Sequence, residues 1–206
     1  HSLTRFIRYI RPSTDQLKRM ATRFMITGSN GLLGQKLINA LAPNDEVELI
    51  ATSRGANRAR LQKGYTYVSM DVTVPEEARK VIHEYKPEVI IHTAAMTQVD
   101  DCETNPAKSH LMNVDAVRFV ALPAHDVGAH FVHISTDFIF DGKYGPLTEE
   151  ARPNPLSVYG KAKLESEEVV KRIMKSYSIL RTILVYGLAD EMSRSNIVLW
   201  AKESLE

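Results

Sequence analysis

Three glycines, at positions 28, 31 and 34, follow the apolar run 23–27 and open a segment with helical spacing. This strand, loop and helix context distinguishes a dinucleotide-binding loop from a chance cluster of glycines. Gly28 permits a tight turn, Gly31 lets backbone amides approach a pyrophosphate, and Gly34 allows the helix to pack closely. The helix N-terminus adds unpaired N–H groups and a partial positive charge. The alternative is a glycine-rich turn without ligand. The residues predicted to line the pyrophosphate site are Gly28, Ser29, Asn30, Gly31, Leu32, Leu33 and Gly34.

Short apolar runs alternate with longer amphipathic segments along the chain. The runs of strand length, rich in β-branched or aromatic residues, are 23–27, 47–52, 65–69, 88–93, 130–135 and 176–182. The segments with the charge spacing of covering helices are 32–41, 75–86, 105–127 and 158–175. Such alternation is typical of βαβ units, so we predict an α/β fold, a Rossmann-type doubly wound parallel sheet of six strands. The irregular stretch 136–157 is long for a compact domain, which indicates a functional loop.

Composition excludes several functional classes. The chain has 26 basic and 25 acidic residues and a formal charge of +1, so no overall field favours nucleic acid or an anionic membrane. Cys102 is the single cysteine, which excludes an internal disulfide framework and fits a reducing compartment. No apolar run reaches the ~20 residues needed to cross a bilayer. We therefore predict a cytoplasmic protein without a membrane or nucleic-acid partner.

Residues 1–22 form a basic extension, in which Asp15 is the one acid before Met20. This extension has three possible interpretations: an organelle transit peptide, a start placed too far upstream, or residues carried over from cloning. The remainder, 23–206, is predicted to be an NAD(P)-binding Rossmann domain with part of a substrate-binding region.

The residues that end the second predicted strand indicate which nicotinamide cofactor binds. NAD-preferring sites commonly place an acid there to hold the ribose 2′-hydroxyl. This chain has Ser53, Arg54 and Arg58 instead, and arginine suits bidentate phosphate contact. We predict NADP (NADPH) as cofactor, with NAD as the alternative. The opposing interpretation is that both arginines are ordinary solvated charges.

Tyr159 and Lys163 are four residues apart in a segment with helical spacing, so they should lie on one helix face. An ordinary tyrosine, with a pKa near ~10, exchanges its proton poorly near neutral pH. We expect the nearby ammonium to lower this pKa, so that Tyr159 can give a proton to a carbonyl beside a nicotinamide. The same spacing also arises by chance in helices whose tyrosine packs and whose lysine is solvated.

The sequence Ser135-Thr136-Asp137 ends the fifth predicted strand. Ligands of open α/β sheets bind beyond the carboxyl ends of strands, so a hydroxyl here can hydrogen-bond a substrate carbonyl. The alternative is an ordinary turn or helix cap.

No metal site is predicted. The acidic residues Asp100, Asp101 and Glu103 are interpreted as a cap of the following helix. His92 and His133 lie within apolar strands, and we interpret them as satisfied interior residues rather than acid–base groups.

From about residue 24 to 206, the chain resembles the extended short-chain dehydrogenase/reductases and, more narrowly, the dTDP-4-dehydrorhamnose reductase group. The motifs that carry the resemblance are TGSNGLLG, HTAAMTQVDDCE, MNVDA, STDFIFDG, EEARPNPLSVYGKAKLESE and LRTILVYG. Phe138 stands where the group usually has tyrosine, so any role of that hydroxyl is lost. Relatives of the group continue for a further ~80 to 100 residues, consistent with an added substrate region. We therefore expect this chain to bind cofactor and to turn over poorly.

The resemblance implies roles for further residues. The catalytic residues it implies are Thr136, Tyr159 and Lys163, with Tyr159 and Lys163 also touching the cofactor and Thr136 and Asp137 near the substrate. Further cofactor-binding residues it implies are Asp71 and Val72 beside the adenine, and Thr93, Ala94, Ala95 and Met96 along the nucleotide. Asn113 would support the active site through backbone and water contacts.

Three functions follow. The first is reduction of the 4-keto group of a nucleotide-linked deoxysugar, as in dTDP-rhamnose synthesis, with a nucleotide sugar as partner. The second is a non-catalytic NADP-binding regulatory subunit, similar to that of methionine adenosyltransferase. The third is nucleotide-sugar epimerisation or dehydration, which the STDFIFDG motif favours less than reduction. Trp200 is interpreted as core or as an interface anchor, which leaves a homodimer open.

Overall fold

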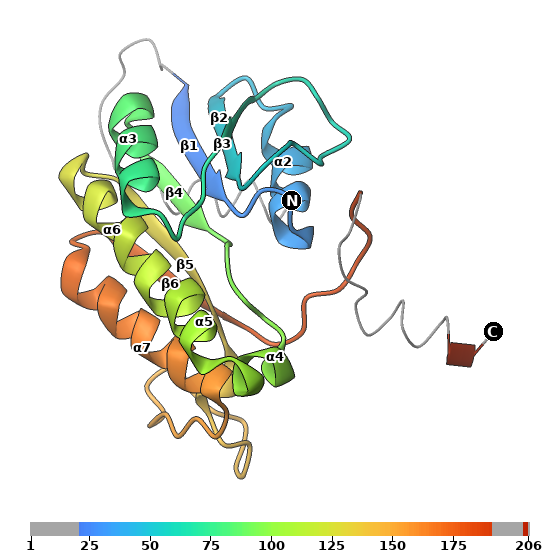
Figure 1. The fold of residues 1–206 in the computed structure, drawn as a ribbon, viewed down its shortest axis with the longest axis vertical. Coiled ribbons are helices and arrows are strands. Elements are labelled where there is room, and N and C mark those ends of the chain that lie inside the picture. The colour runs from blue at the N-terminus through green and yellow to red at the C-terminus, as the bar shows by residue number, and fades with distance from the viewer. Residues whose placement is uncertain (1–20, 191–203, 206) are drawn as a thin grey trace.

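The computed structural model describes residues 21–190 and 204–205 and contains the predicted parallel sheet (Figure 1). Its strand order is β3-β2-β1-β4-β5-β6, and every neighbouring pair is parallel. The strands are β1 Thr22–Thr27, β2 Val47–Ser53, β3 Thr66–Ser69, β4 Val89–His92, β5 His130–Thr136 and β6 Tyr177–Thr182. The predicted fold class is confirmed, and Trp200 lies outside the described residues.

Helices cover both faces of the sheet (Figure 1). The main helices are α2 Leu32–Leu41, α3 Pro75–Tyr85, α6 Ala116–Asp126 and α7 Val158–Ile173. Figure 1 shows α3, α6 and α7 side by side on one face and α2 on the other. Among the described residues, none of these helices has the length and apolarity to cross a membrane.

Alternate side chains of the buried strands supply two separate hydrophobic cores. Met25 of β1 and Ile50 of β2 join the core beneath α3, α6 and α7. Phe24 and Ile26 of β1 join Leu49 and the apolar side of α2 in the other core. Burial on both faces explains why these strands read as continuous apolar runs in the sequence.

The segment 105–127, predicted as one helix, is divided in the structure. It follows α4 (Val99–Thr104) and consists of α5 (Pro106–His110), a π-helical turn η1 (Leu111–Asp115) and α6. Asn105 Oδ1 accepts a hydrogen bond from Lys108 N at 3.2 Å and caps α5, with Pro106 in its first turn. The acidic residues at 100–103 were interpreted as a cap of the following helix. That interpretation is wrong for α5, because these residues lie within α4. Glu103 Oε1 instead accepts a hydrogen bond from Val158 N, 2.7 Å away, at the start of α7.

Helix α7 begins where the long loop after β5 ends. Ser157 Oγ accepts a hydrogen bond from Gly160 N at 3.0 Å, which caps the helix. A Cβ atom at Gly160 would lie 2.3 Å from the carbonyl oxygen of Phe138, in the 3-10 turn η2 (Asp137–Ile139). Glycine therefore allows the start of α7 to pack directly on the turn that follows β5. This contact brings Tyr159 close to Thr136.

Candidate active site

The predicted site residues lie at one edge of the sheet. Each of them is at or just beyond the carboxyl end of β1, β2, β3, β4 or β5, or on α2 or α7. Because the strands are parallel, these ends form a common edge, where ligands of open α/β sheets bind. The loop after β1 and the segment after β4 are in direct contact: Thr93 Oγ1 donates a hydrogen bond to Thr27 O at 2.7 Å. A Cβ atom at Gly28 would lie 2.6 Å from Ala94 N.

The glycine loop has the geometry that an anionic dinucleotide group requires. A Cβ atom at Gly34 would lie 2.5 Å from Gly28 O, so α2 starts against the loop itself. Gly31 occupies the N-cap position and supplies no side-chain cap, which leaves N–H groups at the start of α2 available to an anion. Ser29 Oγ is buried and has no hydrogen-bond partner among the described residues. The loop thus fits the pyrophosphate of a dinucleotide.

The predicted adenosine end of the site is held by side-chain hydrogen bonds. Asn30 Nδ2 donates to Ala56 O at 2.8 Å, and Asn30 Oδ1 accepts from Arg58 N at 2.9 Å. These bonds fasten the loop after β2 to the glycine loop. The Arg54 side chain is 81% exposed and lies 3.5 Å from the carboxylate of Asp71. Arg54 is therefore accessible to a ligand, and Asp71 is its competing partner in the free protein.

Asn113 supports the site through direct backbone contacts. Its Oδ1 accepts a hydrogen bond from Met96 N, and its Nδ2 donates one to Met96 O, both at 2.9 Å. Asn113 is buried within the π-helical turn η1, a type of distortion often found at functional sites. The side chain therefore fixes the backbone of the segment after β4.

Tyr159 lies against the residues that follow β5. Burial raises the pKa of Tyr159 to about 12, although a hydrogen bond with the Thr136 side chain opposes this shift. Thr136 Oγ1 donates to Asp137 Oδ1 at 3.1 Å. The phenol ring also packs edge-on against Phe138, with 6.0 Å between ring centroids. The structure thus joins a protonated phenol, a hydroxyl and a carboxylate from two parts of the chain.

Lys163 does not act on Tyr159 in the way that we expected. Its side chain is buried, and Nζ lies 3.3 Å from Nε2 of His133. Burial lowers the pKa of Lys163 to about 8, opposed by the nearby carboxylate of Glu167. The expected lowering of the Tyr159 pKa by this ammonium is therefore wrong for this structure, in which burial raises the pKa. Desolvation of the phenol is the larger effect.

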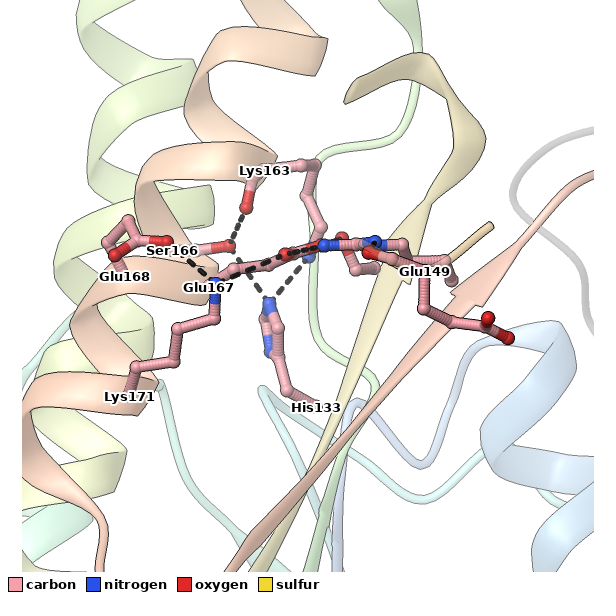
Figure 2. A network of polar contacts seen from close by, with 9 residues as sticks. His133, Glu149, Lys163, Ser166, Glu167, Glu168 and Lys171 are labelled. Carbon is pink, nitrogen blue, oxygen red and sulfur yellow. Dashed lines mark hydrogen bonds and ion pairs between the residues drawn. The ribbon is translucent and has the colours of Figure 1, made fainter. Parts of the chain in front are cut away.

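A buried polar network beside Lys163 was missed in the sequence (Figure 2). Glu167 Oε1 accepts hydrogen bonds from Ser135 Oγ at 2.6 Å and from Arg181 Nε at 3.0 Å. Its Oε2 accepts a third from Arg181 Nη2 at 2.7 Å. Arg181 also donates to Glu149 O in the long loop, at 2.7 Å. The network joins α7, β5, β6 and this loop. The sequence carries no local signal for it, because its members meet only when these elements pack together.

Comparison with known proteins identifies the family and supports the fold. The family model "RmlD substrate binding domain" matches residues 22–204. A dTDP-4-dehydrorhamnose reductase from Clostridium acetobutylicum is 35% identical, with a TM-score of 0.75 over 89% of this chain and 59% of that chain. The reductase from Bacillus anthracis, solved in complex with NADP, is 30% identical with a TM-score of 0.75, over 89% of this chain and 59% of that one.

A second kind of relative is the beta subunit of methionine adenosyltransferase 2. Methionine adenosyltransferase 2 subunit beta from Xenopus tropicalis is 34% identical over 185 residues, which are 90% of this chain and 53% of the relative. The chain thus spans about half the length of such curated relatives. The NADP found with one reductase agrees with the predicted cofactor.

Proposed function

Because the chain belongs to the RmlD substrate binding domain family, we propose that it serves in the NADPH-dependent reduction of a nucleotide-linked 4-keto deoxysugar. The observation that carries this proposal is the contact between Tyr159 and Thr136 at the carboxyl end of β5, on the same sheet edge as the glycine loop. A dinucleotide bound along that loop would extend toward the phenol.

The residues present can supply the proton and the orientation that this reaction needs. NADPH, when bound, supplies the hydride that reduces C4 of the sugar. Tyr159 holds its proton firmly at neutral pH, since burial raises its pKa to about 12, and can transfer it to the C4 oxygen. The Thr136 hydroxyl can hydrogen-bond the same oxygen as negative charge develops there. Lys163 is proposed to bind the nucleotide ribose and to lower the phenol pKa once that ligand is in place.

The same proposal assigns roles to the other predicted residues. The glycine loop would hold the pyrophosphate, the segment 93–96 would lie along the nicotinamide half, and Asp71 and Val72 would flank the adenine. Asp137 would contact the sugar.

A direct assay tests the proposal. The chain and its Tyr159→Phe variant are incubated with NADPH and a panel of dTDP- and UDP-linked 4-keto sugars, and cofactor oxidation and products are followed. We expect slow turnover with at least one dTDP-sugar and a further loss of about 100-fold or more in Tyr159→Phe. Tyr144→Phe is the matched control, because Tyr144 is 82% exposed in the long loop and should be neutral. Undiminished turnover in Tyr159→Phe would contradict the assigned chemistry.

A non-catalytic regulatory subunit is the second candidate. The observation that favours it is the 34% identity to methionine adenosyltransferase 2 subunit beta over 90% of this chain. In that case NADPH binds, no sugar is reduced, and the chain forms a complex with a methionine adenosyltransferase catalytic subunit. Size-exclusion chromatography of the two purified proteins, with and without NADPH, distinguishes this candidate from the first.

A further inference from the structure

Two polar side chains, Lys163 and Ser166, lie within hydrogen-bond distance of one nitrogen of His133. That nitrogen cannot satisfy both of them in a single tautomer. His133 Nε2 lies 3.3 Å from Lys163 Nζ and 2.9 Å from Ser166 Oγ. Ser166 Oγ donates its hydrogen to Lys163 O at 2.6 Å, so toward His133 it acts as an acceptor. The three side chains are buried. Figure 2 shows them between α7 and the sheet.

Two hydrogen-bonding patterns compete for this nitrogen. A charged Lys163 ammonium has only donors and needs the lone pair of His133 Nε2. Ser166 Oγ, in contrast, needs a hydrogen on Nε2. His133 stays neutral in both patterns, because burial lowers its pKa well below the ordinary value, so its single hydrogen lies on either Nδ1 or Nε2. Nδ1 has no partner within the described part of the chain, so no hydrogen bond on that side of the ring fixes which nitrogen carries the hydrogen.

We propose that His133 is a positioning residue for Lys163: its Nε2 accepts a hydrogen bond from the ammonium in the arrangement of Figure 2 and donates to Ser166 when Lys163 turns to the nucleotide. In the first state the imidazole hydrogen is on Nδ1. In the second it is on Nε2: one nitrogen loses a proton and the other gains one, so the charge of His133 does not change. The first state stands without the proposed function, whereas the second rests on it, because that function places a nucleotide ribose beside Lys163.

Other charged groups around α7 have partners of their own. The carboxylate of Glu167 on α7 acts on the pKa of Lys163, and Glu167 is paired with Arg181 on β6. Lys163 in turn lowers the pKa values of His133 on β5 and His92 on β4, both of which burial already lowers. Cys102 on α4 and Asp137 in η2 act on Tyr159. At the surface, Asp115 in η1 pairs with His110 on α5 and Arg118 on α6, and His110 also contacts Glu165. The ammonium therefore has a neutral imidazole as its hydrogen-bond partner, and the state of that imidazole should follow its charge.

Nitrogen-15 NMR of the histidine side chains tests the first state without any cofactor. Near pH 7 we expect His133 to carry its hydrogen on Nδ1, with the resonance assigned by its loss in His133→Gln. Above the Lys163 pKa of about 8, the hydrogen should move to Nε2. In Lys163→Met the hydrogen should be on Nε2 at every pH. An Nε2–H form already near pH 7, or a tautomer that is the same in Lys163→Met, would overturn the proposal.

Titration of NADPH binding against pH tests the second state by cofactor fluorescence. His133→Phe keeps a buried ring but removes the acceptor, which favours neutral Lys163. The loss of NADPH affinity with rising pH should then begin about one pH unit lower than in the unsubstituted chain. At a pH where affinity is already falling, this corresponds to about a tenfold weaker affinity. His133→Gln should restore most of the pH dependence of NADPH affinity, because its carbonyl oxygen can accept a hydrogen bond from the ammonium. The proposed change of partner at Nε2 is refuted if His133→Phe does not shift this pH dependence or if His133→Gln does not restore it.

His92→Phe is the matched control for this titration. His92 is equally buried and stacks near His133 at 6.1 Å between centroids, but its Nδ1 pairs with Thr27 Oγ1 at 2.8 Å. The pH dependence of NADPH affinity in His92→Phe should match that of the unsubstituted chain. If NADPH does not bind at all, the proposed function fails, while the NMR result still decides whether His133 holds Lys163.

Discussion

The two halves of the candidate site are built by different means. The half formed by β1 and α2 uses backbone: close approach at Gly28 and Gly34 leaves no room for a Cβ atom, and the start of α2 carries no side-chain cap. The half formed by β5 and α7 uses buried charged side chains, with Lys163 2% and Glu167 0% exposed. The first half offers backbone N–H groups to charge that a ligand would bring, whereas the second half contains charges of its own.

The two buried charges of the second half are also stabilised unequally. Burial alone would raise the pKa of Glu167, but hydrogen bonds from Arg181 and Ser135 outweigh it and hold this pKa below the ordinary value. Lys163 is paired with a neutral imidazole, and its pKa is lowered to about 8. Glu167 therefore behaves as a structural ion, while Lys163 is held in a state that a ligand can change. Incomplete stabilisation of one charge is a feature of functional sites.

Removal of the Glu167 carboxylate should have the largest effect on stability. Glu167→Met keeps the side-chain volume and leaves the Arg181 guanidinium and the Ser135 hydroxyl without their acceptor. We expect the free energy of unfolding to fall by about 3 kcal/mol, at the lower end for a broken buried ion pair because the Arg181 side chain is 20% exposed. Urea denaturation followed by circular dichroism measures this change.

Two further variants sharpen this result. In Glu167→Met/Arg181→Met both charges are absent, so most of the lost stability should return. Glu168→Met is the surface control, because Glu168 is exposed and pairs with Lys171, and it should change stability by about 0.5 kcal/mol or less. A double variant no more stable than Glu167→Met would show that the carboxylate is not needed chiefly to balance Arg181.

Gly34→Ala tests the backbone-built half. The new methyl group would lie 2.5 Å from Gly28 O and 2.6 Å from Ser29 Cα, so the start of α2 or the glycine loop must move. We expect a loss of about 1–3 kcal/mol of stability from overpacking. NADPH affinity, measured by fluorescence, should fall by more than stability alone explains because the displaced atoms are those that face the pyrophosphate.

Asn39→Ala is the control for Gly34→Ala. Asn39 is exposed on the same helix, and alanine favours helix there, so stability should be unchanged or slightly higher. If both variants bind NADPH equally well, the glycine loop is not the pyrophosphate site.

The difference between the two halves also explains how much the sequence could predict. The sheet, its six strands and the glycine loop were predictable because each depends on residues that are consecutive in the chain. The breaks around η1 were missed because Asn113 adopts its place through contacts with Met96, and such contacts do not appear as a local pattern.

The polar network was hidden for the same reason, and the electrostatic expectation for the phenol was wrong. Glu167 and Arg181 read as ordinary surface charges until α7 and β6 are placed against β5. The spacing of Tyr159 and Lys163 was evident, but it specifies neither how deeply each side chain is buried nor where the ammonium points. Burial raises the pKa of the phenol and lowers that of Lys163, and the ammonium lies against His133.

Arg54→Ala should have the smallest of these effects, and it tests the exposed end of the backbone-built half. The guanidinium is 81% exposed and already lies 3.5 Å from Asp71, so a contact with a 2′-phosphate is screened by water and replaces an existing partner. We expect NADPH affinity to fall by about fivefold, which corresponds to about 1 kcal/mol, with NADH affinity unchanged. Arg60→Ala, an exposed arginine of the same loop, is the control and should alter neither affinity. Asp71→Asn removes the competing carboxylate and should strengthen NADPH binding slightly. Equal changes for NADPH and NADH in Arg54→Ala would mean that Arg54 does not read the 2′-phosphate.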